Sequence, residues 1–93
     1  MIKHIYLFKL KDKSKVDEIS AKIMSLKDHI PYMAECEVGV DFKGAANSYD
    51  LCEMCVFHNK EDFLRFGNDP YHCAIREYMD EQREIGIKID YEI

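Results

Sequence analysis

The segment at residues 2–10 constrains the fold most, because its alternating pattern predicts a strand that is apolar on both faces. On one face Ile5 and Leu7 lie between two lysines. A strand with this pattern is covered on both sides, so the fold must supply a layer on each face. The opposite face of the strand carries Ile2, His4, Tyr6, Phe8 and Leu10.

A helix is predicted next. Ser14 is expected to cap it, with Asp17 at the third helical position as a short capping box. Pro31 ends the helix at or before Ile30. The apolar stripe at helical spacing consists of Val16, Ile19, Ile23, Leu26 and Ile30.

Two further strands are predicted over residues 34–42 and 49–57, separated by a loop of small residues at 43–48. Gly39 weakens the first of them and is expected to mark a bulge. The second again has two apolar faces, apart from Glu53. Its predicted faces are Tyr49, Leu51, Glu53, Cys55 and Phe57 on one side, and Cys52, Met54 and Val56 on the other.

Two helices and a strand complete the chain. Asn59 is expected to cap a short helix that ends at Gly67, and Asp69-Pro70 opens the last helix. Residues 85–93 alternate isoleucine and tyrosine with Gly86 and three charged residues, which predicts a final strand.

The element order β-α-β-β-α-α-β predicts one α+β domain over residues 1–93, with a ferredoxin-like split βαβ topology and a four-stranded antiparallel sheet. Helices can cover only one face of such a sheet. Leaving the other face in water would cost several kcal/mol, at roughly 25 cal/mol per Å2 of apolar area. We therefore expect a homodimer in which the sheets pack face to face.

The net charge of −5 is unfavourable for a nucleic-acid partner, which requires a basic surface. The apolar runs are too short to span a membrane, and residues 1–5 do not resemble a signal peptide. A cytoplasmic location is expected.

Four cysteines occur, and Cys52 and Cys55 have C-x-x-C spacing. In a strand, positions three apart point to opposite faces, so this pair is unsuited to a redox or zinc site. We interpret the cysteines as structural thiols and expect no metal or cofactor.

His72 is the main candidate for chemistry. With Asp69 as N-cap and Pro70 at the first helical position, His72 falls at about the third, where the helix dipole favours a neutral imidazole. A neutral histidine can act as a general base near pH 7. The alternative is structural: the side chain caps its own helix or bonds to a strand.

His4 and Glu53 are predicted on neighbouring strands, and the case to consider is that both point toward the helices. A hydrogen bond between them would satisfy a buried charge, either as a core pair or as an acid–base pair. A metal site formed with His72 is conceivable, but no local ligand motif supports one.

Several segments together resemble the stress-responsive A/B barrel (Dabb) family, whose members are dimeric α+β barrels. They are Met1-Ile2-Lys3-His4-Ile5, Leu7-Phe8-Lys9-Leu10, Ile30-Pro31, Val38-Gly39, Ser48-Tyr49-Asp50-Leu51, Phe57, Pro70-Tyr71-His72 and Asp90-Tyr91. The resemblance covers nearly the whole chain. It implies two ferredoxin-like subunits, each with a pocket between sheet and helices; most members of the family have no established activity.

One plant member of that family is a polyketide cyclase that uses a histidine and a tyrosine. By this resemblance, His72 and His4 match histidines of the cyclase pocket, whereas the tyrosine position is Phe66, which has no hydroxyl. Two apolar positions of that pocket are Glu53 and Cys55 here, which implies a different ligand.

We therefore expect a homodimeric barrel protein of unassigned activity that binds a small apolar or aromatic molecule. An alternative is a cofactor-independent enzyme, a polyketide-cyclase-like lyase or a monooxygenase, with His72 as general base. A third is a stress-protective module that acts by assembly alone. The expected pocket is lined by His4, Tyr6, Phe8, Tyr49, Glu53, Phe66 and His72.

Overall fold

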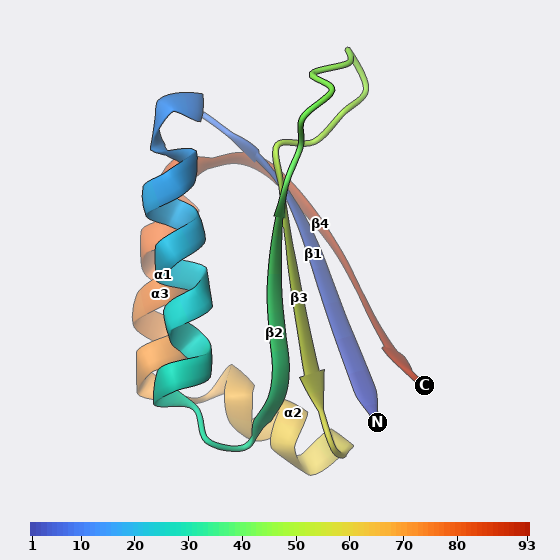
Figure 1. The fold of residues 1–93 in the computed structure, drawn as a ribbon. Coiled ribbons are helices and arrows are strands. Elements are labelled where there is room, and N and C mark those ends of the chain that lie inside the picture. Colours follow the sequence, from blue (N-terminus) through green and yellow to red (C-terminus); the bar gives the residue numbers. More distant parts are fainter.

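Four antiparallel strands and three helices form two layers (Figure 1). The structure is a computed structural model that describes all residues, 1–93. In the sheet the strands lie in the order β2-β3-β1-β4, which confirms the predicted ferredoxin-like fold. The strands are β1 (Ile2–Leu10), β2 (Met33–Val40), β3 (Leu51–Phe57) and β4 (Arg83–Glu92); the helices are α1 (Val16–His29), α2 (Lys60–Gly67) and α3 (Pro70–Gln82).

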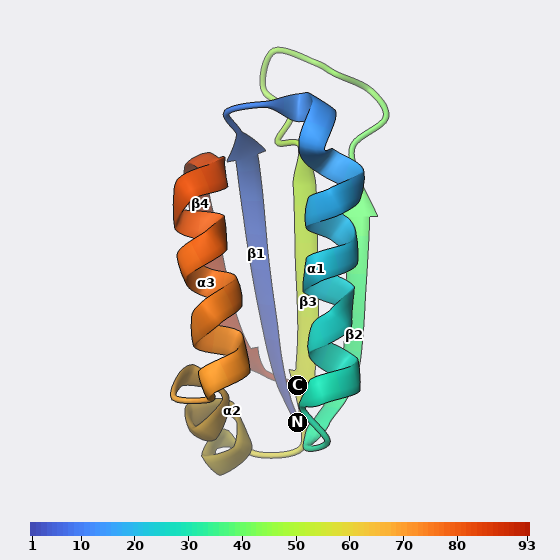
Figure 2. The ribbon, with the colours of Figure 1, turned by 90° about the vertical axis from the view of Figure 1, so that its left-hand side faces the viewer.

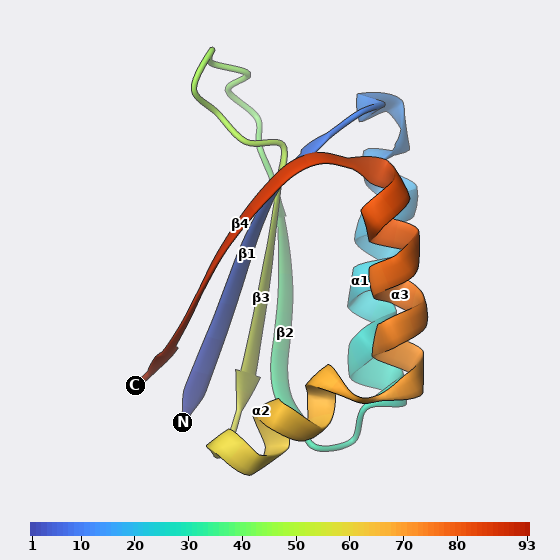
Figure 3. The ribbon, with the colours of Figure 1, turned by 180° about the vertical axis from the view of Figure 1, so that it is seen from behind.

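Helices α1 and α3 lie side by side across one face of the sheet (Figure 2). Seen from behind, the other face has no helix against it, as predicted (Figure 3). Helix α2 lies at the end of the sheet where both termini are found, and the segment between β2 and β3 projects beyond the opposite end (Figure 1). None of the three helices is long and apolar enough to cross a membrane.

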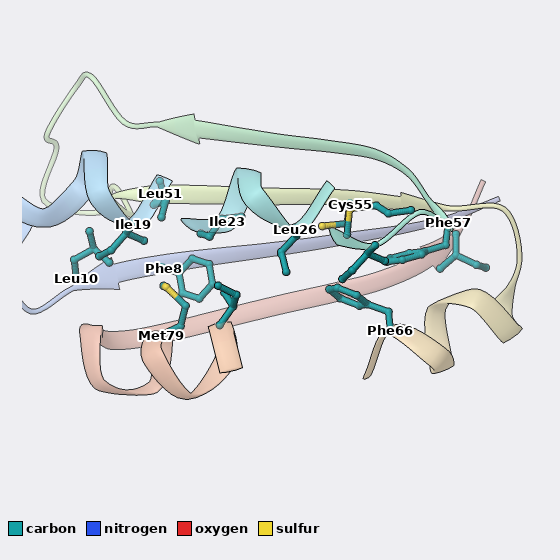
Figure 4. Packing of buried hydrophobic residues seen from close by; sticks show 14 residues of the cluster. Phe8, Leu10, Ile19, Ile23, Leu26, Leu51, Cys55, Phe57, Phe66 and Met79 are labelled. Carbon is teal, nitrogen blue, oxygen red and sulfur yellow. The ribbon is translucent and has the colours of Figure 1, made fainter. Parts of the chain in front are cut away.

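The core lies between the helices and the sheet (Figure 4). Alternate residues of β1 and β3 point into it, and the predicted stripe of α1 packs against them. The residues that are almost completely buried there include Phe8, Leu10, Ile19, Ile23, Leu26, Ile30, Leu51, Cys55, Phe57 and Phe66.

The prediction that Ser14 caps α1 is wrong. Residues Lys13–Lys15 form a short 3-10 turn, and Asp12 caps it by accepting a hydrogen bond from the Ser14 backbone N–H at 3.0 Å. Helix α1 then begins at Val16 without a side-chain cap, because the preceding turn already leads the chain into it.

The prediction that Tyr49 begins the third strand is also wrong. The Asp50 backbone N–H donates to the Phe8 carbonyl at 2.8 Å, and its carboxylate accepts from the Leu10 N–H at 2.8 Å. These bonds fix a bend before β3, so the alternation of side chains does not extend back to Tyr49. The predicted bulge at Gly39 is absent; the register of β2 shifts between Met33 and Glu35 instead.

The predicted caps of the last two helices are confirmed. The Asn59 side chain accepts from the Asp62 N–H at 2.8 Å and starts α2. Asp69 accepts from the N–H groups of Tyr71 and His72 at 2.9 and 3.3 Å, with Pro70 at the first helical position of α3. These bonds satisfy N–H groups that a helix start otherwise leaves without partners.

The helix-free face of the sheet is apolar. Antiparallel pairing of β1 with β4 sets Ile5 opposite Ile89 and Leu7 opposite Ile87. Ile87 and Ile89 remain 50% and 58% exposed, respectively. Cys52 lies on this face, whereas Cys55 is buried on the other, as the strand pattern predicted.

Candidate ligand pocket between sheet and helices

A cavity of about 90 Å3 lies between helix α3 and the helix-covered face of the sheet. Strand side chains from β1, β3 and β4 form one wall, and residues one helical turn apart on α3 form the other. The lining residues are His4, Tyr6, Phe8, Glu53, His72, Ile75, Arg76, Met79, Arg83 and Lys88.

His4 is a buried imidazole held between two carboxylates. The ladders of β1 with β4 and of β1 with β3 place Asp90 and Glu53 on either side of it. Its Nδ1 is hydrogen-bonded to the Asp90 carboxylate, and its Nε2 lies 3.5 Å from the Glu53 Oε2. Both ring nitrogens therefore face a group that favours a proton on them.

Burial alone would lower the pKa of His4, because a charged imidazolium loses hydration. Hydrogen bonds to Glu53 and Asp90, together with the charges of these carboxylates, outweigh burial and raise the pKa above its ordinary value. Of the two histidines of the cavity, His4 is therefore the one whose surroundings favour the protonated form.

His72 has a different environment. Its Nδ1 lies 2.9 Å from the carbonyl oxygen of Phe66, which can only accept, so Nδ1 carries the proton and donates it. The imidazole also stacks on the Phe66 ring, with centroids 3.7 Å apart. These contacts fix the tautomer and the orientation of the ring and leave the lone pair on Nε2 without an intramolecular partner.

Burial lowers the pKa of His72, and the charges of Arg76 and His4 act in the same direction. The Phe66 carbonyl and Glu53 oppose the shift but do not cancel it. The sequence predicted a neutral His72 from the helix dipole, and burial is the larger cause in the structure. The cavity thus contains two histidines whose pKa values are shifted in opposite directions.

Five of the seven residues predicted to line a pocket lie together in this cavity: His4, Tyr6, Phe8, Glu53 and His72. Phe66 does not line it. Its ring lies behind the two histidines, 6.3 Å from the His4 centroid and against the ring of His72. Tyr49 lies elsewhere, in a surface depression with Leu7 and Phe42, because of the bend before β3.

The Tyr6 side chain can lie in the cavity wall because residue 86 is a glycine. Gly86 lies opposite Phe8 on β4, and the Tyr6 ring passes over it. A Cβ built on Gly86 would overlap the Tyr6 Cε1 and lie 3.0 Å from its Oη and 3.1 Å from its Cζ, tighter than side-chain atoms usually pack. The Tyr6 ring in turn stacks on Phe8, with centroids 4.3 Å apart.

Sequence reasoning missed Asp90 as the partner of His4, because the pair depends on the register of strands 86 positions apart. It also missed the other cavity residues of α3, for which a signal existed. His72 and Arg76, and likewise Ile75 and Met79, are four apart and so share a helix face.

The sequence profile described as the stress responsive A/B barrel domain matches residues 2–93. The chain belongs to this family. No curated protein matches this A/B barrel domain in sequence.

Solved structures share the fold of this A/B barrel domain. A dimeric protein of unknown function with a ferredoxin-like fold from Bacteroides fragilis is 26% identical, with a TM-score of 0.84 over 99% of this chain and 95% of that one. The hydroxynitrile lyase of Passiflora edulis is 23% identical, with a TM-score of 0.87 over 99% and 92% of the two chains. A Dabb family protein from Mesorhizobium loti is 21% identical, with a TM-score of 0.76 over 99% and 95%.

Proposed function

We propose that this protein binds a small apolar or aromatic molecule in the cavity and moves a proton on it without a cofactor. The observation that carries the proposal is the pair of histidines in one small cavity whose pKa values are shifted in opposite directions, downward at His72 and upward at His4. Two titratable groups with pKa values driven apart are the usual arrangement of a base and an acid.

His72 is the proposed general base. Its Nδ1–H is held by the Phe66 carbonyl, so Nε2 presents a lone pair while the ring cannot turn to the other tautomer. A substrate C–H or O–H group in the cavity would transfer its proton to this nitrogen. The Phe66 carbonyl then stabilises the imidazolium that results, through the same hydrogen bond.

His4 is the proposed acid. Asp90 orients the ring through Nδ1, which leaves the Nε2 proton shared with Glu53 at the cavity wall. The 3.5 Å separation between Nε2 and the Glu53 Oε2 is long for a hydrogen bond, so a substrate oxygen can compete for this proton. One histidine removes a proton and the other returns one, and no net change in oxidation state is required.

Lyase chemistry, including ring closure, is the reaction class that fits this acid–base pair best. The hydroxynitrile lyase of Passiflora edulis has the same fold, so the fold is compatible with lyase chemistry. Phe66 cannot supply the hydroxyl that the cyclase resemblance implies, and His4 is the proton donor that we propose in its place.

We also propose that the protein is a homodimer that associates through the helix-free face of the sheet. Its exposed isoleucines form an apolar surface on β4, next to Ile5 and Leu7 of β1. The structure from Bacteroides fragilis is described as dimeric, which supports a dimer, and the apolar surface suggests the face through which it forms.

The test is 15N NMR of the four histidines as a function of pH. We expect His72 to remain a neutral Nδ1–H tautomer at pH 7 while His4 carries two protons, and His58, which is exposed, serves as the internal reference. If His4 and His72 titrate together near the ordinary pKa of about 6.5, the proposed acid–base pair is wrong. Native mass spectrometry of the purified protein then tests whether a small molecule is retained.

A further inference from the structure

Cationic side chains are concentrated at the open side of the cavity. The floor consists of buried groups such as Phe8, Ile75 and Met79, whereas Arg76 and Lys88 are exposed and form the rim together with the half-buried Arg83. Three cations thus line a cavity with one carboxylate, Glu53, in a protein whose net charge is −5.

Two of these cations have no carboxylate partner. Arg76 donates only to the Gly67 carbonyl at 3.4 Å and to the Cys73 sulfur at 3.3 Å, and Lys88 makes no ion pair. Arg83 is paired with Asp80 and lies 5.9 Å from the Tyr6 ring centroid. The Glu53 carboxylate interacts with His4 on the cavity wall, so it does not neutralise the positive charges of the rim residues.

We propose that the ligand of this cavity is a small carboxylate, with its apolar body against the floor and its carboxylate group at the rim beside Arg76 and Lys88. This inference rests on the proposed function, since it concerns the same cavity, and adds the chemical class of the ligand. A guanidinium presents a planar fork of N–H donors that matches a carboxylate, and an ammonium adds a point charge.

The dimensions agree with such a molecule. An engineered apolar cavity of about 150 Å3 holds benzene. At about 90 Å3 this open cavity is smaller, so it would hold only part of a single ring, and the substituent would extend to the open side. A polar group at that position meets the rim cations before it meets bulk solvent.

The test uses benzoate and benzamide, which have nearly the same shape and differ in charge. Binding is measured from amide shifts of the 15N-labelled protein during titration. We expect benzoate to bind about tenfold more tightly than benzamide, with shifts centred on α3 and β4, and its affinity to fall as salt is added.

The matched variants are Arg76→Gln with Lys88→Gln at the rim, and Lys43→Gln in the loop between β2 and β3. The rim double variant should lose about tenfold in benzoate affinity and keep its benzamide affinity, whereas Lys43→Gln should change neither. Equal affinities for both compounds, or benzoate binding that survives loss of the rim, would overturn the carboxylate inference but leave an apolar binding pocket. Absence of binding by both compounds would overturn the pocket function as well.

Discussion

At the residue scale, opposite effects of environment on two identical side chains create the candidate site. Burial dominates at His72, whose only polar partner is a carbonyl. Two carboxylates outweigh burial at His4. An imidazole has an ordinary pKa near neutrality, so a shift in either direction changes the balance between its neutral and charged forms near pH 7.

His72→Ala should abolish base catalysis. A suitable probe is 5-nitro-1,2-benzisoxazole, whose ring opens to an absorbing phenolate when a base removes its C–H proton. We expect the wild-type protein to accelerate this opening and the variant to lose at least about 10²-fold, the usual contribution of a positioned base. His58→Ala, which removes an exposed histidine, is the control, and equal rates in the wild type and His72→Ala would exclude His72 as the base.

Asp90→Asn should reduce stability most at acidic pH. A histidine with a raised folded-state pKa contributes stability that is complete below its unfolded pKa of about 6.5 and is lost as pH rises through the folded value. Removing one of the carboxylates that raise it should therefore lower the free energy of unfolding more at about pH 6 than at about pH 9. Urea unfolding at both pH values measures this, and a difference independent of pH would contradict the assignment of His4 as charged.

Gly86→Ala should displace Tyr6 from the cavity wall. The added methyl group has no room beside the Tyr6 ring, and overpacking of this kind costs about 1–3 kcal/mol. We expect lower stability in urea and weaker binding of benzamide. Gly39→Ala is the control, because its new Cβ would meet only the Cys52 Cβ at an ordinary 3.8 Å. Equal stability of the two variants would show that Tyr6 can move without penalty.

At the element scale, the start of α3 orients the candidate base. Asp69 accepts from two backbone N–H groups of α3, one of them that of His72, and its other oxygen accepts from the Tyr32 hydroxyl at 3.2 Å. The segment that ends α2 supplies the Phe66 carbonyl. Asp69 therefore fixes the backbone of His72, and the Phe66 carbonyl fixes its imidazole ring.

Asp69→Ala should therefore cost about 1 kcal/mol of stability and also release His72 from its fixed tautomer. Asn59→Ala removes the equivalent cap of α2 and should cost a similar amount. Thermal unfolding measures the stability of both, and 15N NMR reports the state of His72. An unchanged His72 spectrum in Asp69→Ala would mean that Phe66 alone positions the ring.

Strands and helix starts could be predicted from the sequence where the pattern that determines them lies within a few consecutive residues. Alternation identified β1, and Asp69-Pro70 located the start of α3 to the residue. The start of α1 was missed because Asp12 caps a 3-10 turn at Lys13–Lys15, and this turn leads into α1 without a side-chain cap on α1 itself. The His4–Asp90 pair was missed because strand register joins the two ends of the chain.

At the scale of the whole molecule, the sheet has two apolar faces and helices on one. The core of α1, α3 and the sheet buries the first face completely at residues such as Phe57 and Cys55. The second keeps Ile87 and Ile89 about half exposed, although a soluble monomer rarely exposes a contiguous apolar patch larger than a few hundred Å2. This imbalance is the physical reason for the proposed dimer.

Ile87→Lys with Ile89→Lys should convert the proposed dimer to a monomer, because four lysines would be brought together at a two-fold interface. Analytical ultracentrifugation at several concentrations measures the mass. Met24→Lys changes a similarly exposed apolar residue, 43% exposed, on the side of α1 that borders β2, and should leave the mass unchanged. A wild-type protein that sediments as a folded monomer at all concentrations would refute the proposed association.

Alternate side chains of strand β1 lie on opposite faces of the sheet and contribute to two different surfaces. Its even-numbered side chains, such as His4 and Tyr6, line the cavity, and its odd-numbered ones, such as Ile5 and Leu7, lie on the side proposed to meet a second subunit. No side chain of this strand contributes to both surfaces. Substitutions at the even-numbered positions can therefore change ligand binding without altering the side chains of the proposed subunit interface. Deletion of one residue within β1 would exchange the two sets and disable both at once.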